Sequence, residues 1–190
     1  MHRLTQHDLC KEVIEDCLKG KKRAFRKLYH RYSGLMLGIC MRYARNQSEA
    51  EDILQEGFIK IYQNLKGFRF QGSFEGWMKR IMVNTALNYN RNNLKHHFHL
   101  EINEVEVFSS PNETVTINKH EYPFDTEDLM KMIQALPTGY RTVFNLYIFE
   151  GYSHKEIAEM LQISENTSKS QLSKARKNLQ NIINKATDKK

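Results

Sequence analysis

The sequence predicts an all-α protein, built from two small helical domains joined by a flexible acidic linker. Only three prolines and nine glycines interrupt its 190 residues, which favours long helices. Apolar residues recur with helical spacing along most of the chain, whereas residues 95–125 lack that period. Residues 95–128 hold two lysines and eight carboxylates, a net charge of −6, which leaves +13 for the rest of a chain whose total is +7. We therefore expect domains at 1–94 and 126–190, with 95–125 as the linker.

This charge distribution indicates a polyanionic partner, because two basic bodies separated by an acidic connector suit nucleic acid contacted at both ends. The start, MHRLTQHD, lacks the apolar core of a signal peptide. The longest apolar run, 34–41, is far shorter than the ~20 residues of a membrane helix. We expect a soluble cytoplasmic protein without membrane insertion.

Neither the cysteines nor the histidines predict a metal site. The cysteines are Cys10, Cys17 and Cys40. They form an odd set without a C-x-x-C pair, so neither a disulfide framework nor a zinc site is suggested. His96, His97 and His99 form an HH-x-H run without carboxylate or cysteine partners. We expect no metal and no cofactor.

Helices are predicted over 5–19 and 21–32, residues 33–44 continue the apolar pattern, and the clearest helix is predicted over 48–65. Its inward face, with period 3.6, comprises Ala50, Ile53, Leu54, Gly57, Phe58, Ile61, Tyr62 and Leu65. Ile59 instead lies among the polar residues of the opposite face. These are Glu49, Asp52, Gln55, Glu56 and Gln63. An apolar side chain with a polar rim is typical of the centre of a contact patch, so we expect a protein partner here.

Residues 66–77 follow as a predicted loop with three glycines and four aromatic residues. Aromatic side chains in such a loop can stack on unpaired bases. Alternatively they only cover the core, which we expect for Trp77. The next predicted helix, 78–92, displays cations and amides: Lys79, Arg80, Asn84, Asn88, Asn90 and Arg91. Loop and helix together predict a surface for single-stranded nucleic acid.

Residues 151–179, GYSHKEIAEMLQISENTSKSQLSKARKNL, predict two helices joined by a tight turn. Ser153 and Glu156 form a capping box, and Ser164 is placed to cap the second helix. The exposed side of that helix carries Asn166, Lys169, Ser170, Ser173, Lys174 and Lys177. Such side chains reach base edges and phosphates, so the pattern predicts a DNA-binding helix-turn-helix. A helical hairpin with a solvated lysine face is the alternative.

Four segments together resemble, in order, bacterial sigma factors of the extracytoplasmic-function class. They are AFRKLYHRY (24–32), AEDILQEGFIKIYQNL (50–65), GSFEGWMKRIMVNTALNY (72–89) and ALPTGYRTVFNLYIFEGYSHKEIAEMLQISENTSKSQLSKARKNL (135–179). The resemblance covers nearly everything from Lys21 to Ile183 except the linker. It implies a protein that is not an enzyme and that binds core RNA polymerase. It also implies that the complex starts transcription at promoters by reading their −10 and −35 elements.

The resemblance also implies roles for individual residues. Those that meet core polymerase are Asp52, Gln55, Glu56, Ile59 and Gln63. Those around a flipped −10 base are Phe68, Phe70, Ser73, Phe74 and Asn84, with Lys79, Arg80 and Arg91 on the strand backbone. Those that enter the −35 major groove are Asn166, Thr167, Lys169, Ser170, Ser173 and Lys174, with Arg176 and Lys177 toward phosphates. An anti-sigma factor is a further candidate partner, and we expect a monomer when the protein is free.

Several positions depart from the family pattern. Gln162 stands where glycine is common, so it must tolerate left-handed geometry at a cost of about 1 kcal/mol. Ser168 stands where an apolar residue, usually valine, anchors the recognition helix. Gln171 replaces a frequent arginine, and Asn88 replaces a common aspartate. Ser168 and Gln171 leave the individual −35 contacts open.

Two other classes of protein compete with a sigma factor. A helix-turn-helix regulator that senses a ligand would bind duplex DNA without polymerase, but it leaves Ile59 and the aromatic loop unexplained. A metal-dependent nuclease would use Glu49, Asp52 and Glu56 as Mg²⁺ ligands on one helix face. The sequence offers this nuclease neither a second acidic cluster nor a candidate base.

Overall fold

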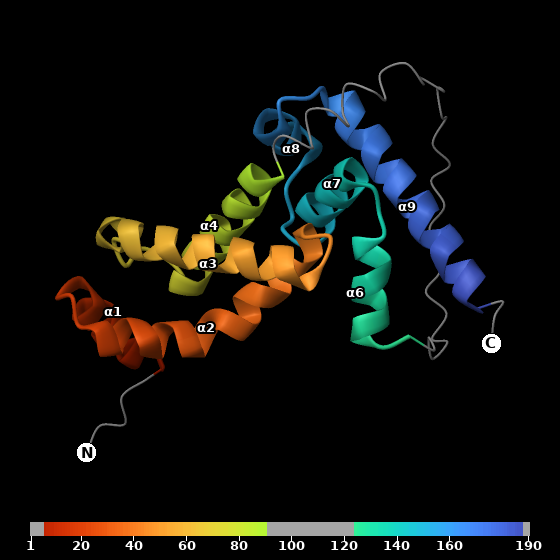
Figure 1. The fold of residues 1–190 in the computed structure, drawn as a ribbon. Coiled ribbons are helices and arrows are strands. Elements are labelled where there is room, and N and C mark those ends of the chain that lie inside the picture. The colour runs from red at the N-terminus through yellow and green to blue at the C-terminus, as the bar shows by residue number, and fades with distance from the viewer. Residues whose placement is uncertain (1–5, 91–123, 188–190) are drawn as a thin grey trace. The chain divides into compact units, whose positions relative to one another are not determined.

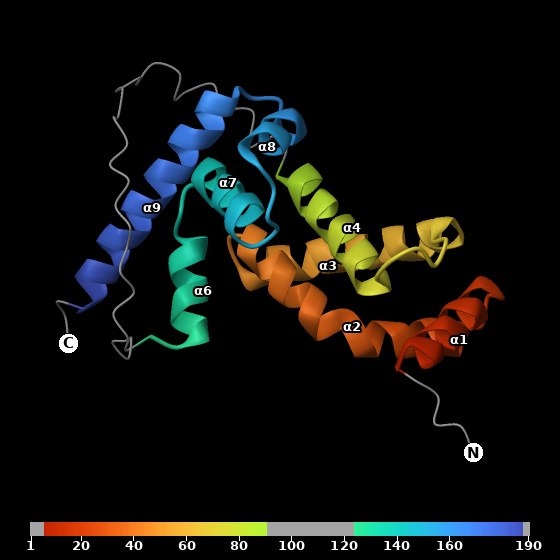
Figure 2. The same ribbon diagram turned by 180° about the vertical axis from the view of Figure 1, so that it is seen from behind.

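The computed structural model describes residues 6–90 and 124–187, with side chains described from residue 11 onward. These residues form eight α-helices and one short 3₁₀ turn, without a strand among them. They divide into two compact units, residues 1–89 and 90–190, which are drawn in Figures 1 and 2. The prediction of an all-α fold is therefore confirmed. Residues 91–123, which include most of the predicted linker and all of its histidines, lie outside the described residues.

The first unit contains helices α1 (Gln6–Leu18), α2 (Lys22–Tyr43), α3 (Gln47–Asn64) and α4 (Phe74–Tyr89), with a 3₁₀ turn at Leu65–Gly67. The helix predicted over 21–32 extends through the apolar residues 33–43 as α2. It contacts each of the other three helices (Figure 1). The buried side chains shared between them include Ile14, Leu28, Met36, Ile53, Ile61, Met78 and Met82.

Helices α3 and α4 approach closely at Gly57. A Cβ atom built at this position would overlap the thioether of Met82, so the missing side chain lets the two helices pack. The inward face predicted for α3 is buried, except that Tyr62 is 51% exposed. Tyr62 lies at the edge of that face, where helical periodicity alone cannot distinguish inside from outside.

The second unit contains α6 (Thr126–Gln134), α7 (Thr138–Ile148), α8 (His154–Leu161) and α9 (Glu165–Thr187). Asp125 caps α6 by accepting a hydrogen bond from the Asp128 amide at 2.8 Å. Helix α9 contacts the other three helices. The core between them includes Met132, Leu136, Val143, Leu146, Ile157, Leu172 and Ala175. Helices α8 and α9 with their short turn form the predicted helix-turn-helix.

Candidate functional site

The outer face of α3 carries Ile59 as an apolar centre with a polar rim, as its periodicity predicts. Ile59 is 50% exposed, and Asp52, Gln55 and Gln63 are exposed beside it. Glu56 is half-buried and forms an ion pair with Lys60 at 2.6 Å. The half-exposed isoleucine stands on a helix whose other face is buried.

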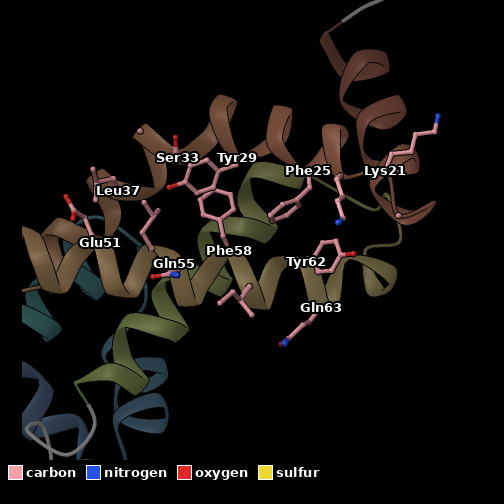
Figure 3. A pocket seen from close by; sticks show the side chains of 15 residues that line it. Lys21, Phe25, Tyr29, Ser33, Leu37, Glu51, Gln55, Phe58, Tyr62 and Gln63 are labelled. Atoms are coloured by element: carbon pink, nitrogen blue, oxygen red, sulfur yellow. The ribbon is translucent and has the colours of Figure 1, made fainter.

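A groove of ≈1010 Å³ between α2 and α3 continues this face (Figure 3). Its aromatic lining comes from both helices. The Phe25 and Tyr62 ring centroids lie 5.1 Å apart, and those of Tyr29 and Phe58 lie 4.6 Å apart. Ile59 lines the same groove. The sequence pattern assigned Tyr62 to the core, whereas Tyr62 and Tyr29 are 51% and 38% exposed.

The aromatic loop is shorter than predicted, since α4 already begins at Phe74. Ser73 Oγ accepts a hydrogen bond from the Gly76 amide at 3.2 Å, which caps the helix start. Phe68 and Phe74 are only 8% and 7% exposed. Their centroids lie 5.0 Å apart, and both contact Trp77, at 5.4 and 5.5 Å. Phe70 differs from them because it is 38% exposed.

Phe70 also has a left-handed backbone, with φ of 56°. For a bulky residue this conformation is strained, and such strain clusters at functional positions. The Lys11 ammonium lies 5.8 Å from the Phe70 ring centroid. Of the aromatic residues proposed for −10 recognition, only Phe70 therefore presents a substantially open ring.

The residues expected around the −10 base line two different grooves. One, of ≈910 Å³ and hereafter the loop groove, is lined by Phe68, Phe70, Ser73 and Phe74 together with Arg31, Tyr32 and Leu35. The other, of ≈420 Å³, contains Asn84 and Asn88 beside Trp77. The loop groove is thus lined by aromatic rings and a hydroxyl, whereas the two amides line the other groove.

The residues expected on the strand backbone have different surroundings. Lys79 pairs with Glu75 at 2.8 Å, and Arg80 is exposed on the same helix. Arg91 lies outside the described residues. Asn90, which the pattern placed on the surface, is only 3% exposed.

The helix-turn-helix has the capping predicted from its sequence. The Ser153 amide donates to Glu156 Oε2 at 2.8 Å, and the Glu156 amide donates to Ser153 Oγ at 3.3 Å, which completes the capping box. The hydrogen bond from the Ser153 hydroxyl lowers the pKa of Glu156. Gln162 is left-handed, with φ of 57° and ψ of 44°. Ser164 Oγ accepts from the Thr167 amide at 2.9 Å at the start of α9.

One side of α9 displays the residues expected to meet duplex DNA. The exposed ones are Asn166, Lys169, Ser170, Ser173, Arg176 and Lys177, and the half-buried ones are Thr167 and Lys174. Lys169 pairs with Glu165 at 2.8 Å, which also lowers the pKa of Glu165. Ser170 Oγ donates to the Thr167 carbonyl at 3.0 Å. Hydroxyls and cations thus share one accessible helix face.

Ser168 and Gln171 lie on the opposite side of α9, where they are 0% and 2% exposed. The departures at these two positions therefore concern packing within the unit. Ser168 Oγ lies 2.9 Å from Nδ1 of His154, whose ring stacks on Tyr147 with centroids 4.6 Å apart. Nothing in the sequence pattern singled out His154, because its partner is 14 residues away on another helix.

Two family models match the chain: sigma-70 region 2 over residues 28–95 and sigma-70 region 4 over residues 126–179. The RNA polymerase sigma-H factor of Pseudomonas aeruginosa is 32% identical over 171 residues, covering 87% of this chain and 89% of that protein. The chain belongs to the sigma factors of the sigma-70 family. The extracytoplasmic-function sigma-E factor of Haemophilus influenzae is 30% identical over 182 residues, which cover 90% of this chain and 93% of that protein.

This sigma factor also resembles a solved structure in fold. That structure is the sigma factor RpoE of Bartonella quintana in complex with the anti-sigma factor NepR, with 19% identity and a TM-score of 0.50. The likeness covers 84% of this chain and 96% of the other. The region 2 match includes the outer face of α3 and the loop groove, and the region 4 match includes all residues expected at a −35 element. The chain is a sigma factor that directs transcription.

None of the helices described is both long and apolar enough to cross a membrane. Within the same parts of the chain, no group of three or more His, Cys, Asp or Glu side chains is placed to hold a metal ion. Glu49, one of the residues a nuclease would need, is hydrogen-bonded to Arg45 Nε at 2.8 Å.

Proposed function

We propose that this sigma factor binds core RNA polymerase through the outer face of α3, with Ile59 at the centre of the contact. The observation that carries this proposal is the 50% exposure of Ile59 among Asp52, Gln55, Glu56 and Gln63. Apolar centres with polar rims are typical of hot spots in protein interfaces. A regulator that worked without polymerase would leave this face without a role.

The test is a pull-down of purified core polymerase. Ile59→Asp, alone or with Gln55→Ala, should weaken binding at least ~30-fold, because a hot spot contributes about 2 kcal/mol or more. Leu18→Asp is the matched control, since Leu18 is a 37% exposed apolar residue of α1. The control should bind normally. Normal binding by Ile59→Asp would refute the interface.

For the −10 element, we propose that a flipped base enters the loop groove and meets Phe70 and Ser73. The buried Phe68 and Phe74 form part of the groove lining. The amides Asn84 and Asn88 would read a neighbouring position, with Lys79, Arg80 and Arg91 along the strand. Capture of an unstacked base would offset the few kcal/mol that unstacking costs.

For the −35 element, we propose that the exposed face of α9 enters the major groove of duplex DNA. Asn166, Ser170 and Ser173 are short enough to read base edges, and the surrounding cations reach phosphates. Transcription by the complex of core polymerase and this chain should begin at discrete sites. The sequences upstream of those sites would then identify both elements.

We further infer that domains of 1–94 and 126–190 flank a linker. We also infer that the protein is cytoplasmic, is monomeric when free and is not an enzyme.

An anti-sigma factor is a second partner that we propose. The apolar groove between α2 and α3 supports it, because a protein that covers this groove would also block Ile59. Competition between such a factor and polymerase for the wild-type chain would test this exclusion.

A further inference from the structure

The N-terminal half of α2 carries a row of basic side chains on its solvent side. Its members, hereafter the α2 basic ridge, are Lys22, Arg23, Arg26, Lys27, His30 and Arg31. All six are exposed. The opposite side of the helix is buried through Ala24, Leu28 and Ile39, so the ridge faces away from the core of the unit.

This arrangement opposes the stability of the helix. Lys22 and Arg26, like Arg23 and Lys27, are four residues apart, and like charges at this spacing destabilise a helix. The first turn of α2 contains no acidic residue, and Lys21 at the cap position makes no capping hydrogen bond. Cations there also oppose the helix dipole. Electrostatics within the helix therefore do not explain the ridge.

Ion pairs do not compensate the ridge within the described residues. Asp16 interacts electrostatically with Lys27. Asp16 is already paired with Lys21 at 2.8 Å, outside the ridge. Arg31 instead lies over the Tyr32 ring, 5.7 Å from its centroid. The ridge thus presents a nearly uncompensated positive surface.

The ridge begins at the loop groove. Arg31 lines that groove together with Phe70 and Ser73, and the remaining ridge residues follow along α2 toward its N-terminus. The ten residues from Lys22 to Arg31 span about 14 Å of helix, a length that faces about four phosphates of one DNA strand. A strand with one base in the loop groove would therefore reach the ridge with its next phosphates.

We propose that the α2 basic ridge binds the phosphates of promoter DNA adjoining the base held in the loop groove. This inference rests on the proposed −10 function of that groove and extends it to a second, sequence-independent contact. An anionic lipid surface would also attract cations, but it would not explain why the ridge is continuous with an aromatic groove suited to a base.

The test uses the full chain assembled with core polymerase. The variant Arg23→Gln/Arg26→Gln/Lys27→Gln is compared with Lys19→Gln/Lys131→Gln/Lys185→Gln, which removes the same charge from exposed positions elsewhere. Promoter affinity is measured across a salt series. The slope of log K against log salt should fall by about 2–3 for the ridge variant, since each phosphate contact contributes ~0.7–0.9, and should fall less for the control.

Two further readouts make the result specific. Single methylphosphonate substitutions should identify phosphates that matter for the wild-type complex and not for the ridge variant. Thermal unfolding of the ridge variant should occur at an equal or higher temperature, because repulsion is removed. A salt slope of the ridge variant equal to that of the control would overturn the inference. Promoter binding that is unchanged in the ridge variant, together with loss of its binding to anionic vesicles, would overturn it as well. If the wild-type complex did not initiate transcription, the proposed function itself would fail.

Discussion

His154 Nδ1 lies 2.9 Å from Ser168 Oγ, so the first residue of α8 is joined to the buried side of α9. Tyr147 of α7 stacks on the same imidazole ring at an interplanar angle of 24°. Three helices of the unit therefore meet at His154. Ser168 occupies a position where the family usually has an apolar anchor, and a hydrogen bond takes the place of that apolar contact.

We expect Ser168→Ala to loosen α9. Loss of the hydroxyl leaves the half-buried His154 Nδ1 without this partner, which costs about 1 kcal/mol. Faster hydrogen exchange of the α9 amides would report this opening, and binding to −35 duplex DNA should weaken with it. Ser173→Ala is the control on the exposed face of the same helix. It should leave exchange unchanged.

The two side chains should also be coupled. His154→Phe combined with Ser168→Val replaces the hydrogen bond by an apolar contact. The double variant should therefore lose less free energy of unfolding than the two single variants lose in sum. We expect a coupling of roughly 0.5–1 kcal/mol in a double-mutant cycle. Strict additivity would show that His154 and Ser168 stabilise the unit independently.

The stability of the second unit should depend on pH through His154. Burial lowers the pKa of His154, Lys169 and Arg176 act in the same direction, and Glu165 opposes them. The unfolded chain, with a histidine pKa of about 6.5, then binds more protons than the folded one. The free energy of unfolding should therefore fall as pH drops below about 6.5, until the folded pKa is passed. His154→Phe should remove this dependence, which hydrogen exchange across a pH series can measure.

Gln162→Gly should stabilise the helix-turn-helix. A left-handed residue with a Cβ costs about 1 kcal/mol, and glycine removes that strain. Glycine also raises the conformational entropy of the unfolded chain, which lowers the free energy of unfolding by about 0.4–1 kcal/mol. We therefore expect the free energy of unfolding to rise by only about a few tenths of a kcal/mol. Gln162→Ala keeps the Cβ and should give no gain. Slower exchange in α8 and α9 for the glycine variant alone would confirm the strain at this turn.

Phe68 and Phe70 should behave oppositely when truncated. Phe68→Ala removes a buried ring beside Trp77 and should destabilise the first unit by about 3–5 kcal/mol. Phe70→Ala removes a ring that is 38% exposed and should leave the fold nearly intact while reducing promoter opening. Trp77 is the only tryptophan of the chain, so its fluorescence follows unfolding of this unit. Permanganate footprinting follows the opening. Normal opening by Phe70→Ala would remove Phe70 from the −10 site.

Local interactions made much of this molecule predictable from its sequence. Helical period placed Ile59 on the outer face of α3, and the capping box placed the start of α8 at Ser153. Left-handed geometry was expected at Gln162 and is present. Each of these features depends on residues within about four positions along the chain, so a sequence pattern contains all the partners that decide them.

Only the tertiary structure decided which aromatic and polar side chains are accessible. Phe68 and Phe70 look alike in the sequence, yet one is covered by Phe74 and Trp77 and the other lies open beside Lys11. Asn84 lies in a different groove from the residues with which it was grouped, and Ser168 meets His154 from another helix. Burial depends on neighbours that are distant in sequence, and no local period contains that information. The sequence by itself determined the helices and the family, and packing decided which of their residues can meet DNA or polymerase.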